Sequence, residues 1–341
     1  NLMKNLALSC MSIRRYGFLI LDPHGEYYDG GEAKKRGLKH AGRPDALVVF
    51  SSRKLDGPYN SLYLASSEIE IADLQNLYEF TEPQKECMQS AQYRYGENWL
   101  VELNDRSVAA INKDLGEKYH EGTINVIKRR LENLFRLDLV TRDPKLSVTK
   151  NIIDSLHDCK VVLVDTSNMF ETEELLISTV LSRAIFERNK ELYGDKERFD
   201  KLPPVLIALE EAQRVLTEAK GSIFAQIARE GRKFKTGLCA VSQQPKLIDS
   251  EIISQFNTLF VLGLADRKDR DILKNSAKQD ISQLENEIQM LMPGEALIAS
   301  PFTPFAVPVK IHLYEEYLAS VPAMGTEKLA STRTVPDRGF Y

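Results

Sequence analysis

The sequence predicts an α/β protein with a doubly wound, mostly parallel sheet and an inserted helical subdomain. At least five short apolar runs without charged residues are bounded by turn-forming residues, which is typical of strands buried on both faces of a sheet. These runs alternate with amphipathic helical segments, as in a chain that winds back and forth across a parallel sheet. Between residues 66 and 158 the strand-like runs disappear and only helical periodicity remains.

The predicted strands are short apolar segments, most of them followed directly by polar or turn-forming residues. In chain order they cover residues 17–21, 46–50, 160–165, 205–209, 237–242, 258–262, 296–299 and 306–312. The last of them contains Pro308, which has no backbone N–H to donate to a neighbouring strand. We therefore expect it at the edge of a sheet.

The predicted helices show a 3.6-residue apolar period and recognisable first turns. They cover residues 1–11, 71–80, 123–137, 173–192 and 222–234. Thr81 followed by Pro83 predicts another helix start, and Ser222 is a plausible N-cap. The division into domains that follows is a core made of residues 1–65 and 159–321, a helical insertion at residues 66–158, and a polar tail at residues 322–341.

The composition excludes several classes of protein. The chain has 341 residues and a formal net charge of −4, so it is not a polybasic nucleic-acid binder throughout, and contacts with DNA would need local patches or a ring of subunits. Its four cysteines form no CxxC pair, which argues against a zinc site or a disulfide framework. No apolar run approaches the length of a membrane span, and we predict a cytoplasmic protein without membrane contacts.

Polar side chains follow three of the predicted strands. Because the carboxyl ends of parallel strands meet at one edge of the sheet, where open α/β sheets bind ligands, we expect these side chains to lie close together. They are Asp22, His24 and Glu26 after the first strand, Glu210 and Glu211 after strand 205–209, and Ser242, Gln243 and Gln244 at the end of the next strand.

These residue types suit hydrolysis of a nucleotide. One acid of the pair can hold Mg²⁺ through its water shell while the next orients or deprotonates the attacking water. Gln243 can hydrogen-bond the γ-phosphate or that water, and Arg229 or Arg232 can stabilise charge on the transferring phosphoryl group, often in the neighbouring subunit's site. Other interpretations stay open: the acids can simply end an exposed strand, the residues after the first strand can cap its turn, and the arginines can form a surface ion-pair face.

Four segments together resemble the HerA family of hexameric DNA-translocating ATPases, which are RecA-like motors. They read LILDPHGEY, LPPVLIALEEAQ, AREGRKFKTGLCAVSQQP and LMPGEALIASPFTPFAVPVKI, and the resemblance extends from the first helix to about residue 312. It implies that Glu210 is the Walker B acid on the metal side, Glu211 the catalytic glutamate and Gln243 the sensor.

The same resemblance assigns the remaining site residues. It places the arginine finger, which acts in trans in a ring, at Arg232, with Arg229 as a second candidate. It places the DPHGE segment, with Asp22, His24 and Glu26, near the nucleotide or the subunit boundary.

The chain departs from the family pattern at the phosphate-binding loop. No G-x-x-x-x-G-K-[ST] motif occurs in the sequence, and the dipeptide Gly-Lys is absent. Family spacing places this Walker A loop immediately before the first helix. We therefore expect the small β-barrel, the first core strand and Walker A of the family to precede Asn1 in the natural protein.

The resemblance implies ATP- and Mg²⁺-dependent translocation along double-stranded DNA by a homo-hexamer. It also implies a partner: a nuclease such as NurA in DNA end processing, or an effector enzyme in antiphage defence. For contacts in the channel we nominate Lys34, Lys35, Arg36 and Lys220.

Two other functions stay open. One is a ring that serves as an assembly scaffold for an effector enzyme, with hydrolysis dispensable. The other is a conjugation-type pump, which would need membrane segments upstream. The tail could dock on a neighbouring subunit.

Overall fold

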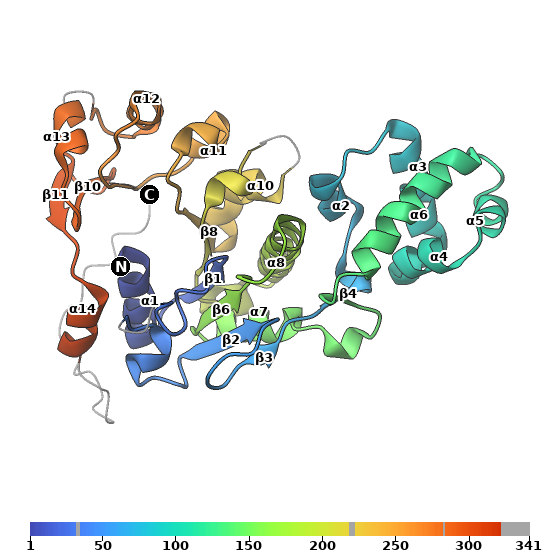
Figure 1. Cartoon of the computed structure of the whole chain (residues 1–341), viewed down its shortest axis with the longest axis horizontal. Coiled ribbons are helices and arrows are strands. Elements are labelled where there is room, and N and C mark those ends of the chain that lie inside the picture. The colour runs from blue at the N-terminus through green and yellow to red at the C-terminus, as the bar shows by residue number, and fades with distance from the viewer. Residues whose placement is uncertain (32–34, 218–221, 282–283, 322–341) are drawn as a thin grey trace.

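The central sheet has six parallel strands in the order β3-β2-β6-β1-β7-β8, and helices cover both of its faces (Figure 1). The computed structural model describes residues 1–31, 35–217, 222–281 and 284–321. The predicted α/β class with a mostly parallel sheet is confirmed. The strands are β1 (Gly17–Asp22), β2 (Leu47–Ser51), β3 (Asn60–Ser61), β6 (Val161–Asp165), β7 (Val205–Leu209) and β8 (Thr236–Ala240).

The middle of the sheet is buried on both faces. Every residue of β1 and β6 is buried, which explains why their sequences are apolar without alternation. Within β1, Phe18 and Ile20 join one hydrophobic cluster while Leu19 and Leu21 join another, because successive side chains of a strand point to opposite faces. The sheet thus separates two apolar cores.

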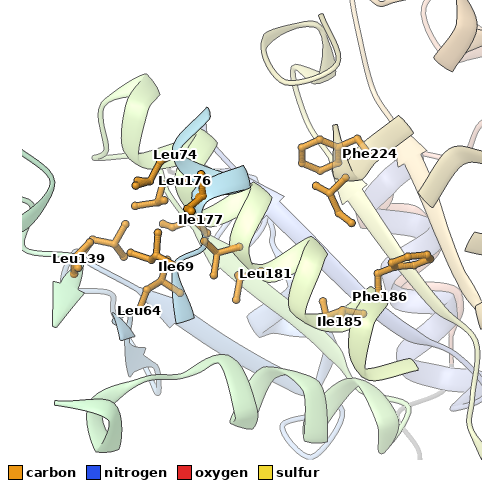
Figure 2. Packing of buried hydrophobic residues seen from close by; sticks show 14 of the residues in the cluster. Leu64, Ile69, Leu74, Leu139, Leu176, Ile177, Leu181, Ile185, Phe186 and Phe224 are labelled. Atoms are coloured by element: carbon orange, nitrogen blue, oxygen red, sulfur yellow. The ribbon is translucent and has the colours of Figure 1, made fainter. Parts of the chain in front are cut away.

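Each face has its own set of helices. On one face, α1 (Leu2–Ile13) packs with α14 (Tyr314–Ser320), and both contribute to the cluster that contains Phe18. On the other face lie α7 (Thr149–His157), α8 (Glu171–Leu192) and α10 (Ile223–Glu230). Figure 2 shows the apolar side of α8, with Leu176 and Ile177 toward Leu74 and with Phe186 toward Phe224. The predicted N-cap at Ser222 is confirmed, because its side chain accepts from the amide of Phe224 at 3.2 Å.

Five helices gather into a lobe beside the sheet (Figure 1). They are α2 (Ile71–Leu77), α3 (Glu82–Tyr95), α4 (Trp99–Asp105), α5 (Val108–Asp114) and α6 (Glu121–Phe135), and a small parallel pair, β4 (Leu64–Ala65) and β5 (Val140–Thr141), adjoins them in the chain. Trp99 is 2% exposed and packs in their core. The insertion expected at residues 66–158 also contains α7, and that helix packs on β1 and β6 instead of the lobe.

The last three strands do not extend the central sheet. β9 (Leu259–Val261), β10 (Glu295–Ala299) and β11 (Val307–Lys310) form a separate antiparallel sheet in the order β11-β10-β9, with its own small core around Val261 and Leu297. β11 lies at its edge, as Pro308 predicted. The remaining helices are α9 (Lys196–Lys201), α11 (Ser250–Ile253), α12 (Arg267–Ser276) and α13 (Glu285–Met290).

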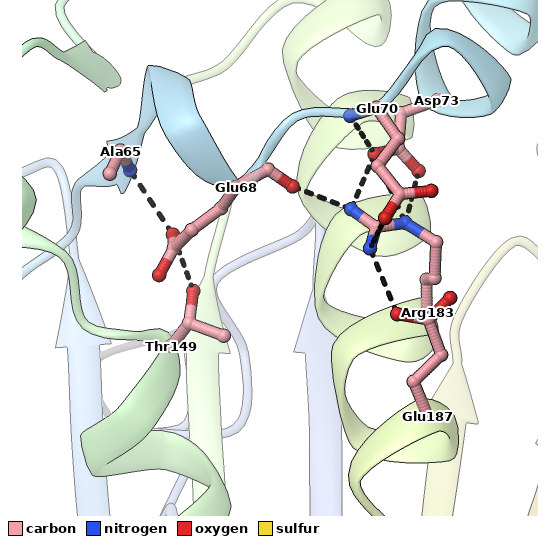
Figure 3. A network of polar contacts seen from close by, with 7 residues as sticks. All are labelled: Ala65, Glu68, Glu70, Asp73, Thr149, Arg183 and Glu187. Atoms are coloured by element: carbon pink, nitrogen blue, oxygen red, sulfur yellow. Dashed lines mark hydrogen bonds and ion pairs between the residues drawn. The ribbon is translucent and has the colours of Figure 1, made fainter. Parts of the chain in front are cut away.

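A buried ion-pair network joins the lobe to α8 (Figure 3). Arg183 is only 8% exposed, and its guanidinium donates to the fully buried carboxylate of Asp73, with the shortest distance 2.7 Å from Nη2. It also pairs with Glu70 at 3.0 Å and Glu187 at 3.1 Å, and it donates to the carbonyl oxygen of Glu68. Because a buried charge is tolerated only when it is paired and hydrogen-bonded, this network holds the start of the lobe in one position against α8.

Replacing Arg183 by Met should lower the free energy of unfolding by about 3–5 kcal/mol, because the carboxylate of Asp73 would stay buried without its partner. Urea unfolding would measure the change. Arg188→Met is the matched control on the same helix, since Arg188 is half exposed and pairs with Glu191 on the surface; it should cost less than about 1 kcal/mol. Equal losses in both variants would contradict the assignment.

Candidate active site

The predicted site residues meet where the central strands end. β1 lies between β6 and β7, and β8 is the next neighbour of β7, so the loops that follow these strands share one edge of the sheet. Contacts within this edge link side chains from three loops: His24 after β1, Glu210 and Glu211 after β7, and Gln243 after β8. We call these four residues, together with Asp22, Tyr27, Gln213 and Ser242, the carboxyl-edge cluster.

Asp22 shapes the turn after β1. Its fully buried carboxylate accepts from the backbone amides of His24 at 3.1 Å, Gly25 at 2.9 Å and Tyr27 at 2.9 Å. Burial raises the pKa of Asp22, and the nearby charge of Asp165 adds to this rise, whereas the three amides oppose it. The contacts of Asp22 are those of a turn-capping residue, which is the alternative that the sequence left open.

A hydrogen bond connects Glu210 to the same turn. The hydroxyl of Tyr27, a residue that is 7% exposed, donates to Oε1 of Glu210. Burial raises the pKa of Glu210, and the charge of Asp22 raises it further, while the hydrogen bond from Tyr27 acts in the opposite direction. Tyr27 was not among the predicted site residues, although it is the last residue of the LILDPHGEY segment.

Glu211 has an unusual backbone and a crowded carboxylate. Its φ of 49° and ψ of 43° lie in the left-handed region, which is uncommon for a residue other than glycine and is often found at functional sites. Nε2 of Gln243 lies 3.1 Å and Nε2 of His24 lies 3.4 Å from its Oε1 atom, and the amide of Gln213 donates to its Oε2 atom.

The environment of Glu211 keeps its carboxylate charged. Burial alone would raise the pKa, but the hydrogen bonds from Gln213 and His24, together with the nearby charges of His24 and Arg214, lower it on balance. An ionised carboxylate held at the carboxyl edge of a parallel sheet can accept a proton from a water molecule. This arrangement therefore suits a general base.

The acids of the cluster fit a magnesium ion that is held mainly by water and phosphate. In the part of the chain that the structure describes, no three Asp, Glu, His or Cys side chains converge to form a metal cage. Mg²⁺ needs no such cage, because one or two carboxylates with waters and substrate phosphates suffice. Burial is the main cause of the raised pKa of Glu210, and the charge of Asp22 adds to it; a nearby cation would offset both effects.

Neither arginine candidate joins the cluster within one chain. Arg232 is exposed in a 3₁₀ turn (Gly231–Phe234) directly before β8 begins, and therefore at the amino edge of the sheet, opposite to Glu211. Arg229, at the end of α10, pairs with the carboxylate of Glu251 at 2.8 Å. Arg229 thus forms a surface ion pair, which is the alternative that the sequence left open for the arginines.

The other nominated residues lie near the turn after β1 or outside the described residues. Glu26 is exposed in that turn. Lys35 and Arg36 are exposed further along the same loop, where the backbone amide of Arg36 donates to Glu315 at 3.2 Å. Lys34, Lys220 and the tail at residues 322–341 lie outside the described residues.

The structure also adds residues that were not nominated. Asp165 ends β6 as Asp22 ends β1, and its carboxylate pairs with Nε of Arg53 at 2.8 Å. Asp165 could have been predicted at the sheet edge in the same way as Glu210, because each acid comes at the end of an apolar strand segment. Gln213 had no comparable signal, and although Ser242 was expected at this edge, its hydrogen bond to Gln213 joins two loops and no local pattern predicts it. Among the described residues, no helix is long and apolar enough to cross a membrane.

The chain is similar to helicases in sequence. The family model described as the central domain of the helicase HerA matches residues 1–185. A probable helicase of Methanocaldococcus jannaschii is 26% identical over 92% of this chain and 63% of its own length. The DNA double-strand break repair helicase HerA of Sulfurisphaera tokodaii is 26% identical over 88% of this chain and 60% of its own length. The chain thus spans about 60% of the length of these two relatives.

Two solved structures share the fold of this chain. VirB4 of Thermoanaerobacter pseudethanolicus aligns with a TM-score of 0.56 at 13% identity, over 92% of this chain and 88% of that one. The plasmid coupling protein TrwB in complex with ADP and Mg²⁺ aligns with a TM-score of 0.53 at 11% identity, over 88% and 79% of the two chains. At these identities the likeness establishes a RecA-like fold.

Replacing Asp22 by Ala should loosen the turn after β1, because three backbone amides would lose their acceptor, two of them in buried contacts. A single orphaned buried donor costs about 1–3 kcal/mol, so we expect a loss of at least this size in urea unfolding. We also expect faster hydrogen exchange at Gly25 and Tyr27. In the control Asp143→Ala, the amide of Lys145 loses its bond to an exposed aspartate and can turn to water. An unchanged exchange rate at Gly25 in the Asp22 variant would refute this account of the turn.

Proposed function

Because the chain belongs to the HerA helicase family, we propose that it carries the motor of a Mg²⁺-dependent ATPase that translocates double-stranded DNA as a homo-hexameric ring. The observation that carries this proposal is the state of Glu211, whose carboxylate has a lowered pKa and accepts hydrogen bonds from His24, Gln213 and Gln243. The fold and the names of the helicase relatives support the coupling to DNA.

In this proposal Glu211 orients the attacking water and accepts its proton, which an ionised acid can do at neutral pH. Gln243 contacts Glu211 directly and would report the state of the γ-phosphate to the strand that follows the acidic one. Glu210 would hold Mg²⁺ through water. Mg²⁺, when bound, supplies positive charge that neutralises the phosphate oxygens. Asp22 and Tyr27 keep Glu210 in place from the neighbouring loop.

The position of Arg232 supports a site completed by a second subunit. A strand of five residues separates Arg232 from the edge that carries Glu211, so the two residues of one chain are about 15 Å or more apart. In a closed ring with head-to-tail contacts, the amino edge of one subunit can face the carboxyl edge of the next. Arg232 then acts in trans, whereas Arg229 keeps its surface pair with Glu251.

The finer parts of the proposal concern partners. We propose that the ring works in the cytoplasm with a nuclease or an antiphage effector enzyme, and that the basic loop after β1, with Lys35 and Arg36, contacts DNA together with Lys34 and Lys220. The competing function is a ring that only organises an effector enzyme. The cluster around Glu211 favours the motor, because a scaffold has no need of an ionised acid in a left-handed backbone conformation.

ATPase activity of the full-length protein with and without duplex DNA tests the motor. We expect DNA to stimulate turnover, and Glu211→Gln to reduce it by about 100-fold or more, because the amide cannot accept the proton. Glu197→Gln on the exposed surface of α9 is the matched control and should retain activity. A well-folded oligomer without turnover under all DNA conditions would favour the scaffold.

Mixing two inactive variants tests the role of Arg232 in trans. Arg232→Ala and Glu211→Gln should each be inactive alone. Mixed rings should regain activity, because about a quarter of random interfaces would combine an intact Glu211 with an intact Arg232. Arg229→Ala should retain activity on its own. Mixed rings that stay inactive, although subunit exchange is demonstrated, would exclude Arg232 as the residue supplied in trans.

A further inference from the structure

A chain of hydrogen bonds connects the loop after β8 to the second oxygen of Glu211. The hydroxyl of Ser242 donates to Oε1 of Gln213 at 2.6 Å, and the amide nitrogen of Gln213 donates to Oε2 of Glu211. The next residue of the same loop, Gln243, donates to Oε1 of Glu211 at 3.1 Å. Two consecutive residues of one loop therefore hold both oxygens of this carboxylate, one directly and one through Gln213.

The direction of these hydrogen bonds follows from the chemistry of the groups. An ionised carboxylate can only accept, so the side-chain NH₂ group of Gln213 must face Glu211. The carbonyl oxygen of Gln213 is then turned toward Ser242, whose hydroxyl can donate to it. Ser242 also accepts from the backbone amide of Gln244 at 3.0 Å, which holds the hydroxyl oxygen within its own loop. Each group in the chain thus has one consistent orientation.

The backbone under this chain is held in register. The amide of Ala212 donates to the carbonyl of Val241 at 2.8 Å, and the amide of Val241 donates to the carbonyl of Leu209 at 2.9 Å. These bonds continue the pairing of β7 and β8 past the ends of both strands. The loop after β8 and the segment that carries Glu211 are therefore joined through backbone and side chains alike.

We infer that Gln213 and Ser242 are positioning residues that orient the carboxylate of Glu211 for its reaction with water. The inference rests on the proposed function, because it assigns the support of the same base. Gln213 makes the contact with Glu211, and Ser242 acts through Gln213 by fixing its amide. Gln243 can then change its contact with Oε1 in response to the γ-phosphate, while the hydrogen bonds through Gln213 keep Oε2 in place.

This role predicts a specific kinetic signature. Loss of the hydrogen bond to Oε2 misorients the base without removing a contact to the nucleotide, so kcat should fall while KM stays nearly unchanged. A purely structural role would instead lower the free energy of unfolding or the fraction of folded enzyme, and kcat per folded subunit would then stay unchanged.

The test measures ATPase kinetics of the full-length protein with Ser242→Ala, Gln213→Ala and the double variant. We expect each single variant to reduce kcat per folded subunit about tenfold or more, as for lost hydrogen bonds to a charged group, and to leave KM nearly unchanged. The double variant should lose no more than Gln213→Ala alone, because Ser242 acts only through Gln213. Ser242→Thr keeps the hydroxyl and should restore activity.

The surface offers a matched control pair. Ser254 and Gln255 also hydrogen-bond to each other through their side chains, at 3.3 Å, outside the carboxyl-edge cluster, and Ser254→Ala and Gln255→Ala should leave kcat and KM unchanged. An unchanged kcat per folded subunit in both Ser242→Ala and Gln213→Ala, or additive losses in the double variant, would overturn the inference while Glu211→Gln still inactivates the enzyme. If the wild-type protein shows no turnover that depends on Glu211, the proposed function fails and this inference falls with it.

Discussion

The common direction of the six central strands is the constraint on which the candidate site depends. Because all six run parallel, the loops that follow β1, β6, β7 and β8 emerge at one edge, and every acid of the cluster lies at the end of a strand or within two residues after it. Helices must cover both faces of such a sheet, and the packing of these layers buries most of the apolar residues of the core. The edge remains as the place where polar side chains can converge.

At that edge, two adjacent carboxylates have opposite electrostatic environments. Glu210 is half-buried near Asp22 and Tyr27, and this burial raises its pKa, whereas Glu211 receives several hydrogen bonds and its pKa is lowered. Sites that perform acid–base chemistry often separate the pKa values of neighbouring groups in this way.

Buried ion pairs and apolar contacts attach the helical lobe to α8 and the central sheet. Arg183 on α8 binds the start of the lobe with charged hydrogen bonds, while Ile69, Leu74 and Leu176 share one apolar cluster with β1 (Figures 2 and 3). Charged pairs that are buried specify geometry more than they add stability. The lobe is therefore fixed to α8. The first turn of this helix contains Glu174, which pairs with Arg214 close to the carboxyl-edge cluster.

The sequence by itself determined which segments become strands and which polar residues follow them. Apolar runs and turn residues are local signals, so β1, β6, β7 and β8 and the positions of Glu210, Glu211 and Gln243 could be predicted, and the family of the chain could be identified from four segments. Only the tertiary structure decided which strands are neighbours. Which strands pair with each other depends on how the helices pack across the sheet. In this fold β9, β10 and β11 form a sheet of their own. For the same reason, the contacts of Tyr27 with Glu210 and of Gln213 with Ser242 join residues of different loops, whose closeness no local pattern encodes.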